Sequence, residues 1–250
     1  MQYQTSKTYL SPPLIRWGVF GIAVLLFFLP SGKLLAQNYD RYQPLQCSGT
    51  IPAELLVRSS EKYAEQVAEL DENTSKSDRK ASEEFLLQSN FIMDDLLLSG
   101  KALFNDPLSI YTNSIKDYLL QDYPEVRDKI KIFVIKSPSV NAFATNNGII
   151  LFNLGLLAHL ENEAQLAFIL CHEFQHYIHH HPINQYVKVQ DLRGNNQLFS
   201  SQALETFLLA KNQYSREMEM EADSMGLQLF LKTKYSLDEI DGVFDQLRYA

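Results

Sequence analysis

The chain has 250 residues, of which 46% are hydrophobic, 21% are charged and 12% are aromatic. This composition excludes a wholly disordered, a collagenous or a disulfide-scaffold protein, and the length allows one or two domains. The formal net charge is −8, and Lys and Arg form no dense block. We therefore expect no nucleic-acid partner, because phosphate contacts need clustered basic side chains.

The N-terminus has the pattern of a secretory signal peptide. Residues 1–16 carry basic but no acidic side chains, and residues 17–29 form an uncharged, mostly apolar run. This run is shorter than the roughly 20 residues of a membrane-spanning helix, and a Pro-Ser-Gly break and the small residue Ala36 follow it. We expect residues 1–36 to be cleaved, and the protein to be exported, periplasmic or secreted, with only peripheral membrane contact. The alternative is an uncleaved anchor.

Mainly helices are predicted after this segment. Apolar residues recur at helical spacing over 53–70, 82–98 and 108–121, and the polar stretch 71–80 is expected to be a loop. We assign residues 37–127 to an N-terminal helical region that shares one domain with the rest of the chain.

A small β-sheet is predicted next. The run at 131–135 is rich in β-formers and is typical of a strand. Two further runs, 141–146 and 148–153, flank Asn147 and Gly148, a pair with a strong preference for hairpin turns. The fold class is therefore α+β, a mainly helical domain with a small sheet or hairpin before the helix that carries the next motif.

Residues 172–176 read His-Glu-Phe-Gln-His, an HExxH segment. On a helix, His172 and His176 lie on one face about 5–6 Å apart, so they can share a metal ion while Glu173 flanks the bound water. Residues 166–178 are apolar on every side, which predicts a buried helix. Buried polar groups need a partner, and a metal ion supplies one. The alternative is two core histidines with hydrogen-bond partners.

A catalytic zinc site normally has three protein ligands and one open position. The metzincin pattern is excluded because it needs Gly and His where this chain has His179 and Pro182. A downstream carboxylate should then be the third ligand, and the candidates are Glu205, Glu217, Glu219 and Glu221.

A helical projection separates these candidates. Over 215–230 the spacing is helical, and Glu219 and Asp223 lie on or beside the apolar arc, whereas Glu217 and Glu221 lie on the opposite side. We prefer Glu219 as the ligand and expect the other two glutamates to be solvated. Asp223 is suited to accept a hydrogen bond from a metal-bound imidazole.

Three histidines, His179 to His181, follow the motif. We expect a solvated helix C-terminus there, which favours positive charge. The alternatives are contact with substrate, a second metal, or a fourth ligand that occludes the site. The next stretch, 184–211, is either a lid over the cleft or a plain surface loop. The end of the chain, 237–250, has helical spacing without a stop signal, so it is a docked helix or continues into a longer protein.

The HExxH segment and two further segments, 141–144 and 215–226, resemble the HtpX-like and CAAX-prenyl-protease-like family of HExxH zinc metalloendopeptidases. The HExxH segment is followed by Ser-Arg-x-x-Glu-x-x-Ala-Asp-x-x-Gly at 215–226, and Asn-Ala-Phe-Ala at 141–144 looks like the family's segment before the active-site helix. The likeness covers roughly residues 130–245, whereas 53–125 matches only loosely.

The resemblance implies a zincin-like metallopeptidase core of the gluzincin type over residues 128–250, with one Zn2+ per chain. It implies protein or peptide substrates, hydrolysed by zinc-activated water in envelope or secreted protein quality control. Its implied roles are catalytic acid/base for Glu173, support of the site for Asp223, and zinc ligation for His172, His176 and Glu219.

The predicted hairpin also suggests how substrate binds. An exposed strand edge can take up an extended peptide as an added strand, and we expect this of Asn141, Ala142, Phe143 and Ala144. The alternative is a hairpin that serves only as scaffold.

Two other functions compete with a peptidase. One is a protease-like binding or chaperone module with an occluded zinc site. The other is a histidine-rich metal-handling protein, which would bind several metals per chain. The sequence indicates neither the substrate nor the oligomeric state.

Overall fold

The computed structural model describes residues 49–57, 59–193 and 214–248, all within one unit of the chain, Leu45–Ala250. The expected signal peptide at 1–36, Glu205 and much of the 184–211 stretch lie outside the described residues. Among the described residues, no helix combines the length and the hydrophobicity that crossing a membrane requires.

The sheet has four strands in the order β1–β2–β4–β3. β2 and β4 are parallel, whereas β1 pairs with β2 and β3 pairs with β4 in the antiparallel sense. The bounds are β1 Ala102–Leu103, β2 Lys131–Ile135, β3 Ala142–Ala144 and β4 Ile149–Asn153.

The predicted strand and hairpin are confirmed. The turn between β3 and β4 includes Gly148, whose φ of 77° is a left-handed conformation that glycine adopts without strain. Strand β1 was not predicted, because a strand of two residues is too short to show a period.

The N-terminal helices are η2 Ala53–Leu55, α2 Ser59–Ala68 and α3 Lys76–Leu98. The predicted loop at 71–80 is therefore too long. The helix α3 begins at Lys76 because the hydroxyl of Ser75 accepts a hydrogen bond from the backbone N–H of Asp78, an N-cap within the polar stretch.

Helix α4, Pro107–Leu119, confirms the helix predicted over 108–121. Pro124 begins a further short helix, α5 Pro124–Lys129, because the fixed φ of proline suits the first turn of a helix. The remaining helices are α6 Leu154–His159, α7 Glu163–Ile178, α8 His181–Arg193, α10 Arg216–Phe230 and α11 Glu239–Arg248.

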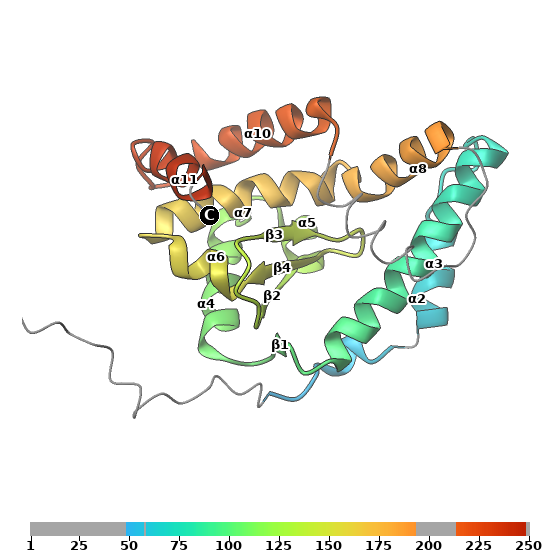
Figure 1. Cartoon of the computed structure of the whole chain (residues 1–250), viewed down its shortest axis with the longest axis horizontal. Helices are drawn as coiled ribbons and strands as arrows, with labels where there is room; N and C mark the ends of the chain where they lie inside the picture. Colours follow the sequence, from blue (N-terminus) through green and yellow to red (C-terminus); the bar gives the residue numbers. More distant parts are fainter. Residues whose placement is uncertain (1–48, 58, 194–213, 249–250) are drawn as a thin grey trace, which may run out of the picture. The chain divides into compact units, whose positions relative to one another are not determined.

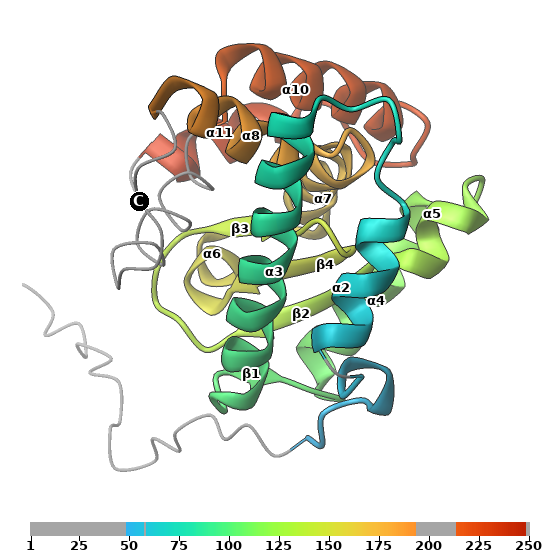
Figure 2. The ribbon, with the colours of Figure 1, turned by 90° about the vertical axis from the view of Figure 1, so that its right-hand side faces the viewer.

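Helices cover both faces of the sheet. One core contains α4, α7 and the side chains of Ile132, Ile150 and Phe152 from β2 and β4. The opposite face, with Phe133 and Leu151, packs against the C-terminal half of α3. Figure 1 shows α10 lying along α7 on the side away from the sheet, and Figure 2 shows α2 and α3 side by side. The helix with the HExxH segment therefore lies between the sheet and α10.

Candidate metal centre and cleft

Helix α7 is buried on all sides, as its sequence predicts. Leu170, Cys171 and Phe174 have no exposed surface, and the helix packs against β3 and α10. Gly226 of α10 permits this close packing, because a Cβ there would lie 3.0 Å from the backbone Cα and N of His172. The HExxH segment is thus fixed in a close-packed interior.

Three side chains meet where α10 crosses α7. His172 Nε2 lies 3.0 Å from His176 Nε2 and 3.6 Å from Glu219 Oε2. The ligand atoms of all three lie within 4.8 Å of one another. Ligands about 2.0–2.1 Å from a tetrahedral zinc ion are about 3.4 Å apart, so these side chains fit zinc with little movement.

Each of the two imidazoles has a partner on Nδ1, the ring nitrogen that faces away from the candidate metal position. Asp223 Oδ1 lies 2.9 Å from His172 Nδ1, and His181 Nδ1 lies 2.9 Å from His176 Nδ1. When these partners take up the Nδ1 hydrogens, both Nε2 atoms carry lone pairs directed at each other. Two lone pairs so close to each other and to a carboxylate repel one another unless a cation lies between them. The arrangement therefore fits a metal ion.

The electrostatics differ among the three groups. Burial lowers the pKa of His172, but the hydrogen bond to Asp223 and the charges of Glu173, Asp223 and Glu219 raise it, and the net direction is upward. Burial and neighbouring histidines lower the pKa of His176 to about 2. Burial raises the pKa of Glu219. His176 is therefore neutral at pH 7 and has a lone pair to donate.

A cleft opens beside these residues between β3 and α10. One cavity of about 530 Å³ has Glu173, Tyr214 and the segment 139–143 in its lining. A second, of about 310 Å³, adjoins it and has the apolar side chains of Leu156 and Phe168 in its wall. Glu173 lines both cavities although only 8% of its surface is exposed.

The segment expected to bind substrate lies along this cleft. Asn141 and Ala142 line both cavities, and Phe143 lines the larger one. Ala144 is only 1% exposed and lines neither of the two, so its side chain is not available to a peptide there.

The strand register shows which backbone groups of β3 are free to pair. The carbonyl of Asn141 accepts a hydrogen bond from the N–H of Asn153, and the N–H of Thr145 donates to the carbonyl of Ile149. Because alternate residues of an antiparallel strand face the partner strand, the N–H and C=O of Ala142 point away from β4. In the described part of the sheet, β3 is an edge strand, so these groups point to its outer edge.

The expectation of a solvated histidine run was wrong for His181, whereas His180 is exposed, as expected. Helix α7 ends at Ile178, and His181 begins α8 with its side chain only 2% exposed. Glu221, expected on a solvated face, has Oε2 3.0 Å from His181 Nε2 and Oε1 3.5 Å from His179 Nδ1. A helical projection of α10 cannot reveal this contact, because the turn between α7 and α8 supplies the partner. Both glutamates are nevertheless exposed, as expected, since 49% of the side chain of Glu221 and 80% of that of Glu217 are accessible to solvent.

Tyr214 is a residue of the site that was not predicted from the sequence. Its ring stacks on that of His176, with centroids 4.1 Å apart and planes 19° apart. Its hydroxyl is buried without a partner among the described residues. Burial and the nearby carboxylates of Glu173 and Glu219 raise the pKa of this hydroxyl. The only signal in the sequence is its place directly before Ser215, the N-cap of α10.

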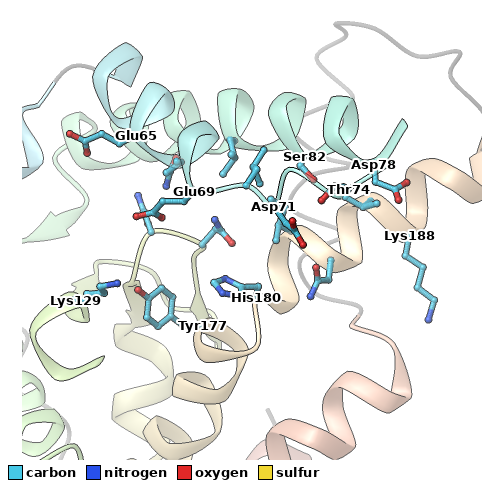
Figure 3. A pocket seen from close by; sticks show the side chains of 18 residues that line it. Glu65, Glu69, Asp71, Thr74, Asp78, Ser82, Lys129, Tyr177, His180 and Lys188 are labelled. Atoms are coloured by element: carbon cyan, nitrogen blue, oxygen red, sulfur yellow. The ribbon is translucent and has the colours of Figure 1, made fainter. Parts of the chain in front are cut away.

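A further cavity of about 850 Å³ lies between the α2–α3 pair and the turn that follows α7 (Figure 3). Acidic side chains, among them Glu65, Glu69 and Asp71, line one side, and Tyr177 and His180 line the other. None of the three metal-site residues lines it, so it is separate from the cleft.

The fold and the site together define a zincin-type metallopeptidase domain, in which an HExxH helix and a glutamate from a later helix meet at one candidate metal position. The model of peptidase family M48 matches residues 121–248, and the chain belongs to this family of zinc-dependent metalloendopeptidases.

Known relatives agree with the family assignment. The chain is 27% identical to the β-barrel assembly-enhancing protease of Escherichia coli O157:H7 over 180 aligned positions, and the match covers 61% of this chain and 36% of the relative. It is 30% identical to the mitochondrial metalloendopeptidase OMA1 of Bos taurus over 150 aligned positions, and the match covers 52% of this chain and 28% of the relative. The chain therefore spans about a third of the length of the curated relatives it matches.

Proposed function

We propose that this chain is a zinc endopeptidase in which His172, His176 and Glu219 bind one zinc ion. The observation that carries the proposal is the convergence of three ligand atoms within 4.8 Å of one another, beside a buried glutamate that lines an open cleft. Membership of family M48 supports the same reaction.

Glu173 is the acid/base of the proposed reaction. Zinc, when bound, lowers the pKa of a coordinated water to about 7 and polarises the substrate carbonyl. The carboxylate of Glu173 accepts the proton of the attacking water and passes it to the leaving amine, so that no covalent intermediate with the protein is needed. Asp223 keeps the ring of His172 in the orientation that directs Nε2 to the metal position.

Substrate binds, in this proposal, as an extended strand along β3. The N–H and C=O of Ala142 are the main-chain groups at the outer edge of the cleft, and Asn141 and Phe143 flank them. Strand addition of this kind takes its affinity mainly from main-chain hydrogen bonds.

The protein is further proposed to act after export, in envelope or secreted protein quality control. The signal-peptide pattern of residues 1–36 supports export. The similarity to bacterial proteins named for enhancing β-barrel assembly supports a role in envelope maintenance.

The test measures zinc content and casein cleavage together, on the purified chain and its Glu173→Gln variant. We expect one zinc per chain in both, and cleavage reduced by at least about 100-fold in the variant, because the proton acceptor is lost. Equal cleavage by both proteins would disprove the mechanism. Zinc in both without cleavage in either would instead support the protease-like binding or chaperone module.

A further inference from the structure

The two histidines of the metal site have different kinds of support. His172 reaches a carboxylate directly, since its Nδ1 lies 2.9 Å from Asp223 Oδ1. His176 Nδ1 instead contacts a third imidazole, that of His181, at 2.9 Å, and His181 Nε2 lies 3.0 Å from Glu221 Oε2. Glu221 and Asp223 come from the same helix, α10, two residues apart.

We propose that His181 and Glu221 are positioning residues that fix the ring and the tautomer of His176 for metal binding. The inference rests on the zinc site proposed above and extends it to two residues outside the HExxH segment and the ligand Glu219. Through them, α10 supports both ligand histidines, one directly and one through an intervening imidazole.

The hydrogen-bond order along this chain of groups determines the tautomers. The carboxylate of Glu221 can only accept, so His181 donates its Nε2–H. A neutral His181 then has a lone pair on Nδ1, and His176 must donate its own Nδ1–H there. The Nε2 of His176 is left with a lone pair toward the metal position. The tautomer of His176 with its hydrogen on Nε2, which cannot bind a metal there, is thereby excluded.

Burial makes this arrangement rigid. Only 2% of each of His176 and His181 is exposed, so water does not compete for the hydrogen bond between them. The ring of Tyr214 stacks on His176 and prevents it from tilting. His179, whose Nδ1 lies 3.5 Å from Glu221, gives the carboxylate a second contact with the same turn.

The experiment measures the zinc dissociation constant of the purified chain and its variants by competition with a chromogenic chelator. His181→Leu should weaken zinc binding about 10- to 100-fold, the range expected when an outer partner of a ligand is removed. His181→Asn should restore most of the affinity, since its amide oxygen can accept from His176 in place of Nδ1. Glu221→Ala should weaken binding roughly 3- to 10-fold, because it acts one step further away.

Glu217→Ala is the matched control, since Glu217 lies on the same helix with 80% of its side chain exposed. Far-UV circular dichroism establishes that each variant is folded, and if His181→Leu does not fold, the exposed Glu221 still provides the test. The visible spectrum of the cobalt-substituted chain should change in His181→Leu but not in Glu217→Ala. Folded variants at His181 and Glu221 that bind zinc within twofold of the control would overturn the inference. A wild-type chain that binds no zinc would overturn the proposed zinc site itself.

Discussion

The two helices that meet at the metal site differ in how the fold supports them. Helix α7 is enclosed between the sheet and α10, and nearly every side chain from Ala164 to His176 is buried. Helix α10 is buried along one line only, and Met220 and Met225 on its other sides are 60% and 39% exposed. Packing therefore fixes the HExxH residues, whereas Glu219 depends on how closely one face of α10 approaches α7.

The largest effect is expected when the two helices are forced apart at Gly226. Gly226→Val places side-chain atoms against the backbone of His172, where a Cβ alone already comes within 3.0 Å. We expect the free energy of unfolding to fall by about 2–3 kcal/mol, a typical cost of overpacking, and zinc affinity to fall with it. Urea denaturation measures the first quantity. Ser224→Val, on the exposed side of α10, is the control for β-branching, and equal midpoints for the two variants would contradict the close-approach argument.

The proposed role of β3 in substrate binding can be tested by a substitution that lies outside both α7 and α10. Ala142→Pro removes an N–H that points away from β4, so we expect an intact fold and a KM for casein raised roughly 3- to 10-fold, the worth of one hydrogen bond. Steady-state kinetics and thermal unfolding measure the two effects. The register gives Phe143 the opposite orientation, so Phe143→Pro should destabilise the hairpin instead. An unchanged KM in Ala142→Pro would leave the hairpin as scaffold only.

A smaller effect is expected at the start of α7, where hydrogen bonds of Glu163 hold the helix in place. Glu163, in its first turn, accepts hydrogen bonds from the hydroxyls of Tyr235 and Tyr111, which lower the pKa of its carboxyl below 4.5. The stabilisation is present above the unfolded-state pKa and is lost as the pH falls through the lower folded-state pKa. Glu163→Gln should therefore cost about 1 kcal/mol at pH 7 and less in acid.

Urea denaturation at pH 7 and at pH values below 4.5 measures this difference. Glu125→Gln, an exposed change at the start of α5, is the control for the loss of one negative charge. A Glu163→Gln deficit that is equal at both pH values would show that the carboxylate charge is not the cause.

The parts of the fold that sequence reasoning predicted are those with a local cause. The hairpin follows from Asn147 and Gly148, and the burial of α7 follows from apolar residues on every side of one helix. Projection of a single helix was also enough to select Glu219 and Asp223 as the acidic residues of α10 that lie near the HExxH face.

The features that were missed depend on contacts between distant segments. His181 and Glu221 are 40 residues apart, and each alone has the sequence context of a solvated residue. The contact between them exists because the chain turns sharply after Ile178, where His180 adopts a left-handed φ of 53°. No period or motif in either segment encodes that turn.

The position of β3 at the edge of the described sheet has a consequence for selectivity under the proposed function. A site that binds through the N–H and C=O of Ala142 recognises groups that every peptide has, so it distinguishes substrates by conformation more than by sequence. A native helix or a paired strand has already used those groups within itself. Unfolded or unassembled chains would then be cleaved at many sequences, while folded neighbours of the same composition would be spared.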